Sequence, residues 1–192
     1  MKIGIDLDGV VIDSESVFRT YEELYDIEDL KSNNLINREE PKFQTRYNWT
    51  NEQVDGYVKK YFMKVSKESH LMPGFKDIYK ILKDQGNEFV VITARGGFLK
   101  EMKDDAIRLL SENGIVFDKY YWHAKEKLEI CKNENIDIMI DDDWHIIKEL
   151  VDNNIKTLYF REANLKKLEE NKYVYEVNNW GDIYRILKRK DE

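Results

Sequence analysis

The sequence begins Met1-Lys2-Ile3-Gly4-Ile5-Asp6-Leu7-Asp8-Gly9-Val10. Residues 2–5 are mostly apolar and predict a short buried strand, and residues 6–9 predict the loop that leaves it. Because ligands of parallel α/β folds bind where the strands end, this layout places the carboxylates of Asp6 and Asp8 on the rim of a buried sheet. An acid pair at such a rim can hold a divalent cation, and it can also take part in a reaction.

A clear break at Pro73-Gly74 divides the rest of the chain. Before it, residues 15–71 are polar, helical in places and rich in aromatic side chains, with no strand pattern of the buried type. We therefore expect residues 15–71 to form a small helical cap, and residues 1–14 and 72–192 to form the core.

Apolar helices and short apolar strands alternate after the break. The expected strands cover residues 89–92, 116–122, 136–140, 157–160 and 174–177. Strands that alternate with helices in this way indicate a parallel sheet. The sequence thus predicts an α/β fold, with a Rossmann-like parallel sheet, helices on both of its faces, and the small helical cap inserted after the first strand.

Composition narrows the class of protein. The 192 residues include 31 basic and 38 acidic ones, and the net charge of −7 argues against a nucleic-acid polymer as partner. No apolar run approaches the roughly 20 residues that cross a bilayer, and the N-terminus has no signal-peptide pattern, so no membrane association is expected. A single cysteine, Cys131, cannot form an internal disulfide. These features together predict a cytoplasmic protein.

Polar residues follow three of the expected strands. Asp6 and Asp8 follow the first strand, Thr93 the second, and Asp141 and Asp142 a later one. Carboxylates packed this closely would repel one another without a cation, so the arrangement implies a bound metal. Hard oxygen ligands in an incomplete shell suggest Mg²⁺, which also accepts a phosphate oxygen from a substrate.

Roles follow once metal and phosphate are placed together. Asp6 would attack phosphorus and form an aspartyl-phosphate, and Asp8 would protonate the leaving alcohol and then deprotonate the attacking water. Thr93 would donate a hydrogen bond to the phosphoryl group, and a lysine would balance its charge. Lys127 and Lys125 are both candidates for that lysine. Candidate substrate-binding residues are Leu7, Gly9, Ala94, Arg95, Lys125, Tyr21 and Trp49. Arg95 can either clamp a phosphate or carboxylate of the substrate or form a salt bridge at the start of a helix.

Four motifs resemble those of the haloacid dehalogenase superfamily of phosphohydrolases. They are Asp6-Leu-Asp8-Gly-Val, Ile92-Thr93, the lysine, and Ile140-Asp141-Asp142, with the cap in the place of that superfamily's C1 cap. The resemblance implies that the Asp6 carboxylate, the Asp8 backbone carbonyl and Asp142 ligate Mg²⁺, with Asp141 supporting. Asp8 favours a phosphatase or phosphomutase, because members that cleave carbon–halogen bonds lack this second acid.

A narrower resemblance concerns the substrate. The string Thr93-Ala-Arg and the run Lys127-Leu-Glu-Ile-Cys are similar to nucleotidases related to 5′(3′)-deoxyribonucleotidases. We therefore expect a phosphomonoesterase whose partner is a small phosphorylated metabolite, with a nucleoside monophosphate as the first choice. Tyr21 and Trp49 can stack on a base or fill the core of the cap. The alternatives are a phosphatase for sugar phosphates or other metabolites, a phosphomutase, and a binding module without catalysis. Oligomerisation through exposed aromatics is left open.

Overall fold

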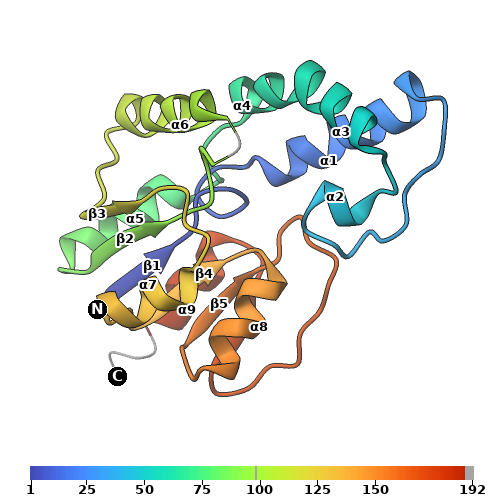
Figure 1. Cartoon of the computed structure of the whole chain (residues 1–192). Coiled ribbons are helices and arrows are strands. Elements are labelled where there is room, and N and C mark those ends of the chain that lie inside the picture. The colour runs from blue at the N-terminus through green and yellow to red at the C-terminus, as the bar shows by residue number, and fades with distance from the viewer. Residues whose placement is uncertain (98, 189–192) are drawn as a thin grey trace.

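The computed structural model describes residues 1–97 and 99–188. Its centre is one six-stranded parallel sheet in the order β3-β2-β1-β4-β5-β6. The strands are β1 (Lys2–Ile5), β2 (Glu88–Ile92), β3 (Lys119–Tyr121), β4 (Ile138–Asp141), β5 (Thr157–Phe160) and β6 (Val174–Val177). The predicted α/β fold with a Rossmann-like sheet is thus confirmed (Figure 1).

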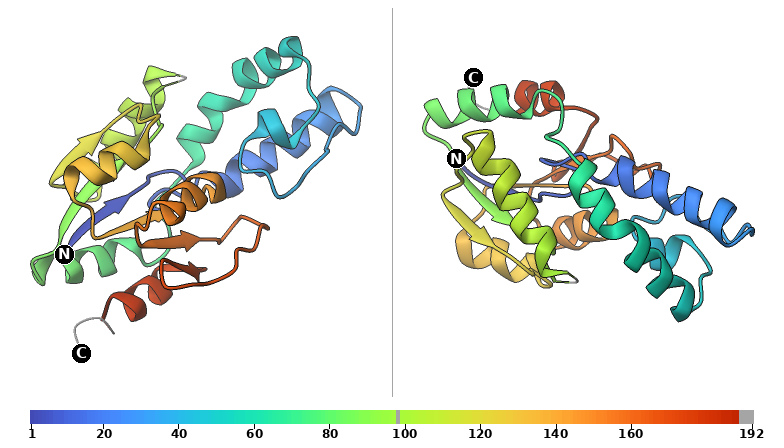
Figure 2. Two further views of the ribbon diagram at one scale, coloured as in Figure 1. Left: turned by 60° about the horizontal axis from the view of Figure 1, so that its bottom comes forward. Right: turned by 90° about the horizontal axis from the view of Figure 1, so that it is seen from above.

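Helices cover both faces of the sheet (Figure 2). One face packs against α5 (Phe75–Asp84), α6 (Lys100–Glu112) and α9 (Trp180–Lys188), and the other against α7 (Lys127–Glu134) and α8 (Trp144–Asp152). Alternate side chains of β2 enter the two cores, with Phe89 on the first face and Val90 on the second. A strand buried on both sides must be apolar throughout, which explains the continuous apolar runs in the sequence.

Two strands are shorter than the sequence predicted. The strand expected over 116–122 is formed only over Lys119–Tyr121, and Val116 is 72% exposed in the preceding loop. The strand expected from residue 136 begins at Ile138. The Ile136 N–H instead closes the end of α7 by donating to the Cys131 carbonyl at 3.0 Å.

The segment between β1 and α5 is helical and lies beyond the carboxyl ends of the strands (Figure 1). Its helices are α1 (Glu15–Leu24), α2 (Phe43–Arg46), α3 (Asn51–Tyr57) and α4 (Met63–Glu68), with π-helical turns η1 (Tyr25–Asp29) and η2 (Val58–Phe62). These elements, here called the cap, pack around an aromatic core that includes Tyr57 and that Met102 of α6 also enters. Among the helices within the described residues, none has both the length and the hydrophobicity that crossing a membrane requires.

Strand register brings distant acids together. Ile5 of β1 pairs with Ile140 of β4, and the Asp6 N–H donates to the Ile140 carbonyl at 3.0 Å. Asp6 and Asp141 therefore leave adjacent strands side by side. The chain connections run in opposite directions from β1 and β4, so these acids stand at the point where such sheets bind ligands.

Candidate active site

Three carboxylates form a buried cluster at this edge. One oxygen from each of Asp6, Asp141 and Asp142 lies within 4.8 Å of the others. Burial raises the pKa of all three, to about 7 for Asp141 and well above the usual value for Asp142. Repulsion from a neighbouring carboxylate adds to each shift in pKa: Asp8 acts on Asp6, and Asp6 acts on Asp141 and Asp142. A cation bound among them would relieve that repulsion and favour the ionised forms.

The donor set fits a hard divalent cation. Asp6 Oδ1 is buried and has no hydrogen-bond partner among the described residues. Asp141 is already engaged, because its Oδ2 accepts from Lys127 and its Oδ1 from the Asp143 N–H at 3.0 Å. Asp6 and Asp142 are thus the acids best placed to hold Mg²⁺, with Asp141 beside them.

Lys127 lies inside the cluster. Its Nζ is 2.7 Å from Asp141 Oδ2 and 3.1 Å from Asp6 Oδ2, and the side chain is 4% exposed. Burial alone would lower the pKa of this lysine, but the Asp141 and Asp6 carboxylates outweigh that effect and raise it. Lys125 is exposed and lines the same cavity as Asp6 and Lys127. Between the two candidate lysines, the structure places Lys127 beside Asp6.

Arg95 binds several protein groups and also borders a cavity beside Asp8. Its guanidinium forms an ion pair with Asp8, donates to the Met102 carbonyl at 2.9 Å, and donates to Ser66 Oγ at 3.3 Å. The side chain is 1% exposed. Asp8 also accepts a hydrogen bond from Ser14 Oγ at 2.6 Å. Arg95 therefore positions Asp8 and joins it to the cap helix α4.

Two backbone amides in the first loop donate to carbonyl groups of the same loop. The Gly9 N–H donates to the Ile12 carbonyl at 2.9 Å, and the Val10 N–H donates to the Leu7 carbonyl at 3.4 Å. Leu7 is fully buried in the core. Gly9 adopts a positive φ of 69°, and a Cβ there would meet Asp142 Oδ2 at 2.2 Å. The role of Gly9 in this structure is to let the Asp142 carboxylate approach the loop.

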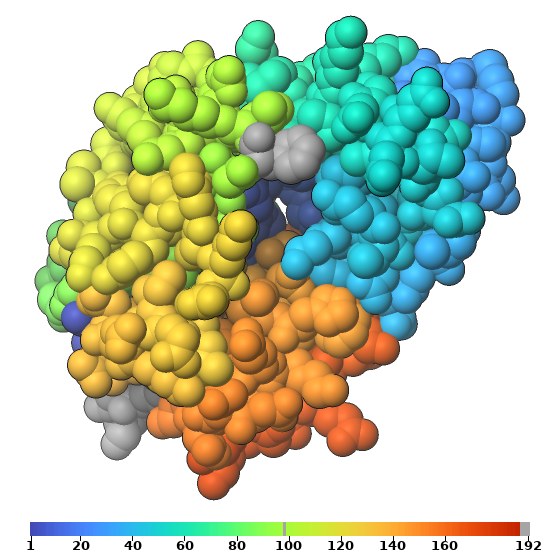
Figure 3. Space-filling model, viewed as in Figure 1, coloured from blue at the N-terminus to red at the C-terminus, as the bar shows by residue number. Residues whose placement is uncertain are grey.

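Two adjoining cavities separate core and cap. The first, of about 390 Å³, exposes the chemistry-bearing groups Asp6, Asp8, Thr93, Lys127 and Asp142. The second, of about 250 Å³, extends under the cap. Both are bordered by Asp8, Glu15 and Ala94, so they form one cleft. Figure 3 shows the surface hollowed between the core and the cap.

Aromatic residues of the cap divide into two groups. Trp49 stacks on Tyr47 with ring centroids 4.4 Å apart, and its indole N–H donates to Asp26 at 2.8 Å. Tyr21 stacks on Tyr61 and donates to Glu68. Neither Tyr21 nor Trp49 is among the described residues that line the cleft. The aromatic rings that do line it belong to Phe18, Phe43 and Phe62.

Sequence reasoning missed two polar residues at the site. Glu15 opens α1 and borders both cavities, and its Oε1 lies 2.8 Å from Arg46 Nη2 and 2.8 Å from Arg19 Nε. Its place in the first helical turn after the acidic loop is a signal that could have revealed it. Asn164 contacts Asp142 from the segment between β5 and β6, where the sequence has no pattern that marks it.

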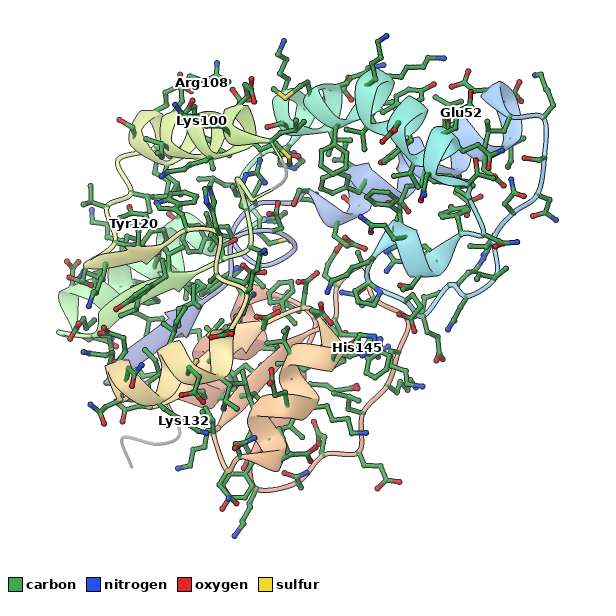
Figure 4. The ribbon with its side chains drawn as sticks, viewed as in Figure 1. Glu52, Lys100, Arg108, Tyr120, Lys132 and His145 are labelled. Atoms are coloured by element: carbon green, nitrogen blue, oxygen red, sulfur yellow. The ribbon has the colours of Figure 1, made fainter. Side chains whose placement is uncertain are left out.

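The core also contacts the cap along α8. His145, labelled in Figure 4, lies at the edge of the core that faces the cap, and its Nε2 is 3.1 Å from Glu40 Oε2. Nearby, Lys42 Nζ lies 3.5 Å from Asp143 Oδ2. Asp143 itself caps α8 by accepting from the His145 N–H at 2.9 Å.

Comparisons with known proteins bear on the fold. No protein-family model matches the chain, and no curated protein sequence matches it. A haloacid dehalogenase-like hydrolase from Streptococcus pneumoniae is similar in structure, with a TM-score of 0.68, 17% identity, and 96% of this chain and 97% of that chain covered. A predicted phosphatase from Clostridium acetobutylicum gives a TM-score of 0.66, 20% identity, and 98% coverage of each chain.

A third solved structure, a predicted phosphoglycolate phosphatase from Haemophilus somnus, gives a TM-score of 0.60 and 16% identity over 96% of each chain. None of these three is named as a nucleotidase. At such low identity the likeness concerns the fold, and it extends over nearly the whole of each chain. The chain therefore has the three-dimensional fold of structures described as haloacid dehalogenase-like hydrolases and phosphatases.

Proposed function

We propose that this protein is a Mg²⁺-dependent phosphomonoesterase that acts through an aspartyl-phosphate on Asp6. The observation that carries the proposal is the buried Asp6 carboxylate, which lies 3.1 Å from Lys127 and lines the cleft. Within the described part of the chain, its Oδ1 has no hydrogen-bond partner. Bound Mg²⁺, held by Asp6, Asp142 and the Asp8 backbone carbonyl with Asp141 supporting, would neutralise charge between a carboxylate and a phosphate.

The reaction divides into two steps. In the first, Asp6 Oδ forms a bond to phosphorus while the bond to the ester oxygen breaks, and Asp8 gives its proton to the leaving alcohol. In the second, Asp8 takes a proton from water, whose oxygen attacks phosphorus and releases inorganic phosphate and the Asp6 carboxylate. Asp8 can serve both steps because it borders both cavities. Thr93 and Lys127 stabilise the phosphoryl oxygens.

Our first choice of substrate is a nucleoside monophosphate. The cavity under the cap presents the rings of Phe18, Phe43 and Phe62, which can contact the flat apolar face of a base. Such stacking contributes roughly 1–3 kcal/mol per base. The carboxylates of Glu15 and Glu22 border the same cavity and can accept hydrogen bonds from hydroxyl or amino groups of the leaving nucleoside.

A phosphatase for sugar phosphates or small phosphorylated acids is the second candidate. One structure with this fold is described as a predicted phosphoglycolate phosphatase, and Lys42 and Gln44 in the cleft can bind hydroxyl groups. A leaving group that carries a carboxylate would, however, approach Glu15 and Glu22. Phosphomutase activity would use the same Asp6 with a second hydroxyl acceptor in the place of water.

Phosphate release from a panel of esters tests the proposal. The panel contains 5′- and 3′-nucleoside monophosphates, phosphosugars and phosphoglycolate, each with Mg²⁺. Asp6→Asn should abolish turnover and keep the fold, whereas Asp55→Asn, a matched change at an exposed acid of α3, should leave turnover unchanged. Turnover by Asp6→Asn close to that of the parent protein would overturn the assignment of Asp6.

Other outcomes separate the alternatives. A strong preference for phosphosugars would overturn the nucleotide assignment and keep the phosphatase. Phosphoryl transfer to added hydroxyl compounds would indicate a phosphomutase. Absence of phosphate release from every ester, with Mg²⁺ bound, would overturn catalysis and favour a module that only binds a phosphorylated ligand.

A further inference from the structure

Asn164 lies in the irregular segment between β5 and β6, yet it is only 3% exposed. Residues of such a connecting segment are normally at the surface, since irregular backbone has polar groups that need water. Leu165, its neighbour, is 54% exposed. The burial of Asn164 therefore reflects specific contacts of its side chain.

The amide nitrogen of Asn164 contacts Asp142 twice. Nδ2 donates to the Asp142 backbone carbonyl at 2.9 Å and approaches Asp142 Oδ2 at 3.2 Å. On another side, Asp142 Oδ2 is the atom that lies over Gly9. Asn164 and Gly9 together fix the direction in which this carboxylate points.

The amide oxygen of Asn164 contacts the cap. Arg19 of α1 donates to it from Nη2 at 2.8 Å. The same guanidinium pairs with Glu15, and its Nη1 donates to the Arg38 carbonyl at 3.1 Å. One amide side chain thus links an acid at the end of β4 to two segments of the cap.

We propose that Asn164 is a positioning residue that holds Asp142 in its metal-binding orientation and makes that orientation depend on the cap through Arg19. The inference rests on the proposed role of Asp142 as a Mg²⁺ ligand. Residues that orient metal ligands typically change metal affinity by 10–100-fold when they are replaced. An amide suits this position because it donates to Asp142 and accepts from Arg19 at once.

Binding of Mg²⁺ to the full-length protein, measured by isothermal titration calorimetry without substrate, tests the first part. Asn164→Leu should raise the Mg²⁺ Kd about 10–100-fold. Asn171→Leu is the matched control, because Asn171 is an exposed asparagine of the same segment whose Oδ1 accepts from the Tyr173 N–H. Its Kd should equal that of the parent protein. Should the leucine variant fail to fold, Asn164→Ala gives the same comparison with a smaller side chain.

Arg19→Met tests the link to the cap. Whether it strengthens or weakens Mg²⁺ binding shows if Arg19 acts by its charge or through Asn164. Removing a positive charge near the acids would strengthen Mg²⁺ binding if Arg19 acted only by its charge. Loss of the anchor for Asn164 should weaken binding severalfold instead. Because Arg19 acts through Asn164, the double variant should bind no more weakly than Asn164→Leu alone, and Arg19→Lys should recover part of the affinity.

The outcomes distinguish this inference from the proposed function. A parent protein that binds no Mg²⁺ overturns the metal site and with it both proposals. Equal Mg²⁺ affinity in the parent protein and Asn164→Leu overturns the positioning role and leaves the phosphatase proposal standing. Tighter binding by Arg19→Met overturns the link to the cap.

Discussion

Gly9→Ala should displace the Asp142 carboxylate from the acid cluster. The same substitution at Gly114 separates this effect from the effect of backbone strain. Gly9 has a φ of 69° and Gly114 a φ of 68°, so an alanine at either position adopts the same left-handed conformation. That conformation costs an alanine roughly 1–2 kcal/mol. At Gly114 a Cβ would meet nothing within 4 Å, whereas at Gly9 it would meet Asp142 Oδ2 at 2.2 Å and Asp142 Cγ at 2.6 Å.

The extra effect at Gly9 follows from these distances. Carbon–oxygen contacts are ordinarily about 3.3 Å or longer, so the Asp142 carboxylate must retreat by about 1 Å. A displacement of this size at a reacting group can reduce the rate about 100-fold. We expect both variants to lose about 1–2 kcal/mol of unfolding free energy from strain, and only Gly9→Ala to lose Mg²⁺ affinity and phosphatase activity.

Three measurements check this prediction: urea unfolding in the presence of a chelator, Mg²⁺ titration by calorimetry, and phosphate release from the best ester. The comparison between the two alanine variants removes the contribution of backbone strain. If Gly9→Ala binds Mg²⁺ as tightly as Gly114→Ala and turns over ester as fast, Asp142 does not act from the position described above.

Further predictions concern the charged partners of the site. Arg95→Met should lower kcat about 10–100-fold with little change in KM, because Arg95 orients Asp8 for proton transfer. Proton transfer by a positioned side chain typically contributes about 10²–10⁴-fold to the rate, and steady-state kinetics on the best ester measure the loss. Lys127→Met should lower the unfolding free energy of the metal-free protein by about 3–5 kcal/mol, because it leaves Asp141 without its buried partner; urea titration measures this, and an unchanged midpoint would contradict it. Burial raises the pKa of Asp141 and Glu22 to about 7, so both bind protons more tightly in the folded than in the unfolded chain. The unfolding free energy of the metal-free protein should therefore fall as pH rises from about 5 to about 8, by roughly 3 kcal/mol for Glu22 alone. Bound Mg²⁺ should reduce the part of this pH dependence that comes from Asp141, and urea unfolding at a series of pH values measures both effects.

The sheet edge could be read from the sequence because parallel strands end at a common rim. Asp6, Thr93 and Asp141 each follow an apolar run, and strand pairing places those ends together whatever the rest of the chain does. The period and length of the runs are local properties, so they survive without knowledge of tertiary contacts. The shortened strands near residues 116 and 136 show where neighbouring turns override that local signal.

The contacts between the cap and the core could not be predicted from the sequence in this way. The sequence left open whether Arg95 clamps a substrate or forms a salt bridge, because its partners Asp8, Met102 and Ser66 come from three separate segments. Trp49 and Phe43 are both aromatic residues of the cap, and only tertiary packing determines which of the two rings faces the cleft. Periodicity predicts that a helix has a buried face, but it does not say which other element covers that face.

The two sides of the cap are attached to the core by different kinds of contact. On the α6 side, Met102 packs into the aromatic core of the cap and is 5% exposed. On the α8 side, the contacts join polar side chains of which one partner is exposed, including the pairs of Lys42 with Asp143 and of His145 with Glu40. Exposed pairs contribute about 0–1 kcal/mol each, and separating apolar surface costs about 25 cal/mol for every Å².

The α8 side is therefore the weaker attachment, and it is the side on which Arg19 of the cap contacts Asn164. Asn164 differs from the exposed pairs because it is buried and because its other bonds go to Asp142. Separation of the cap on this side would break the Arg19 contact and leave the amide oxygen of Asn164 without it. The geometry of Asp142 thus depends on an attachment that is otherwise weak, which makes the Mg²⁺ affinity of Arg19 variants the most direct measure of how the cap acts on the acid cluster.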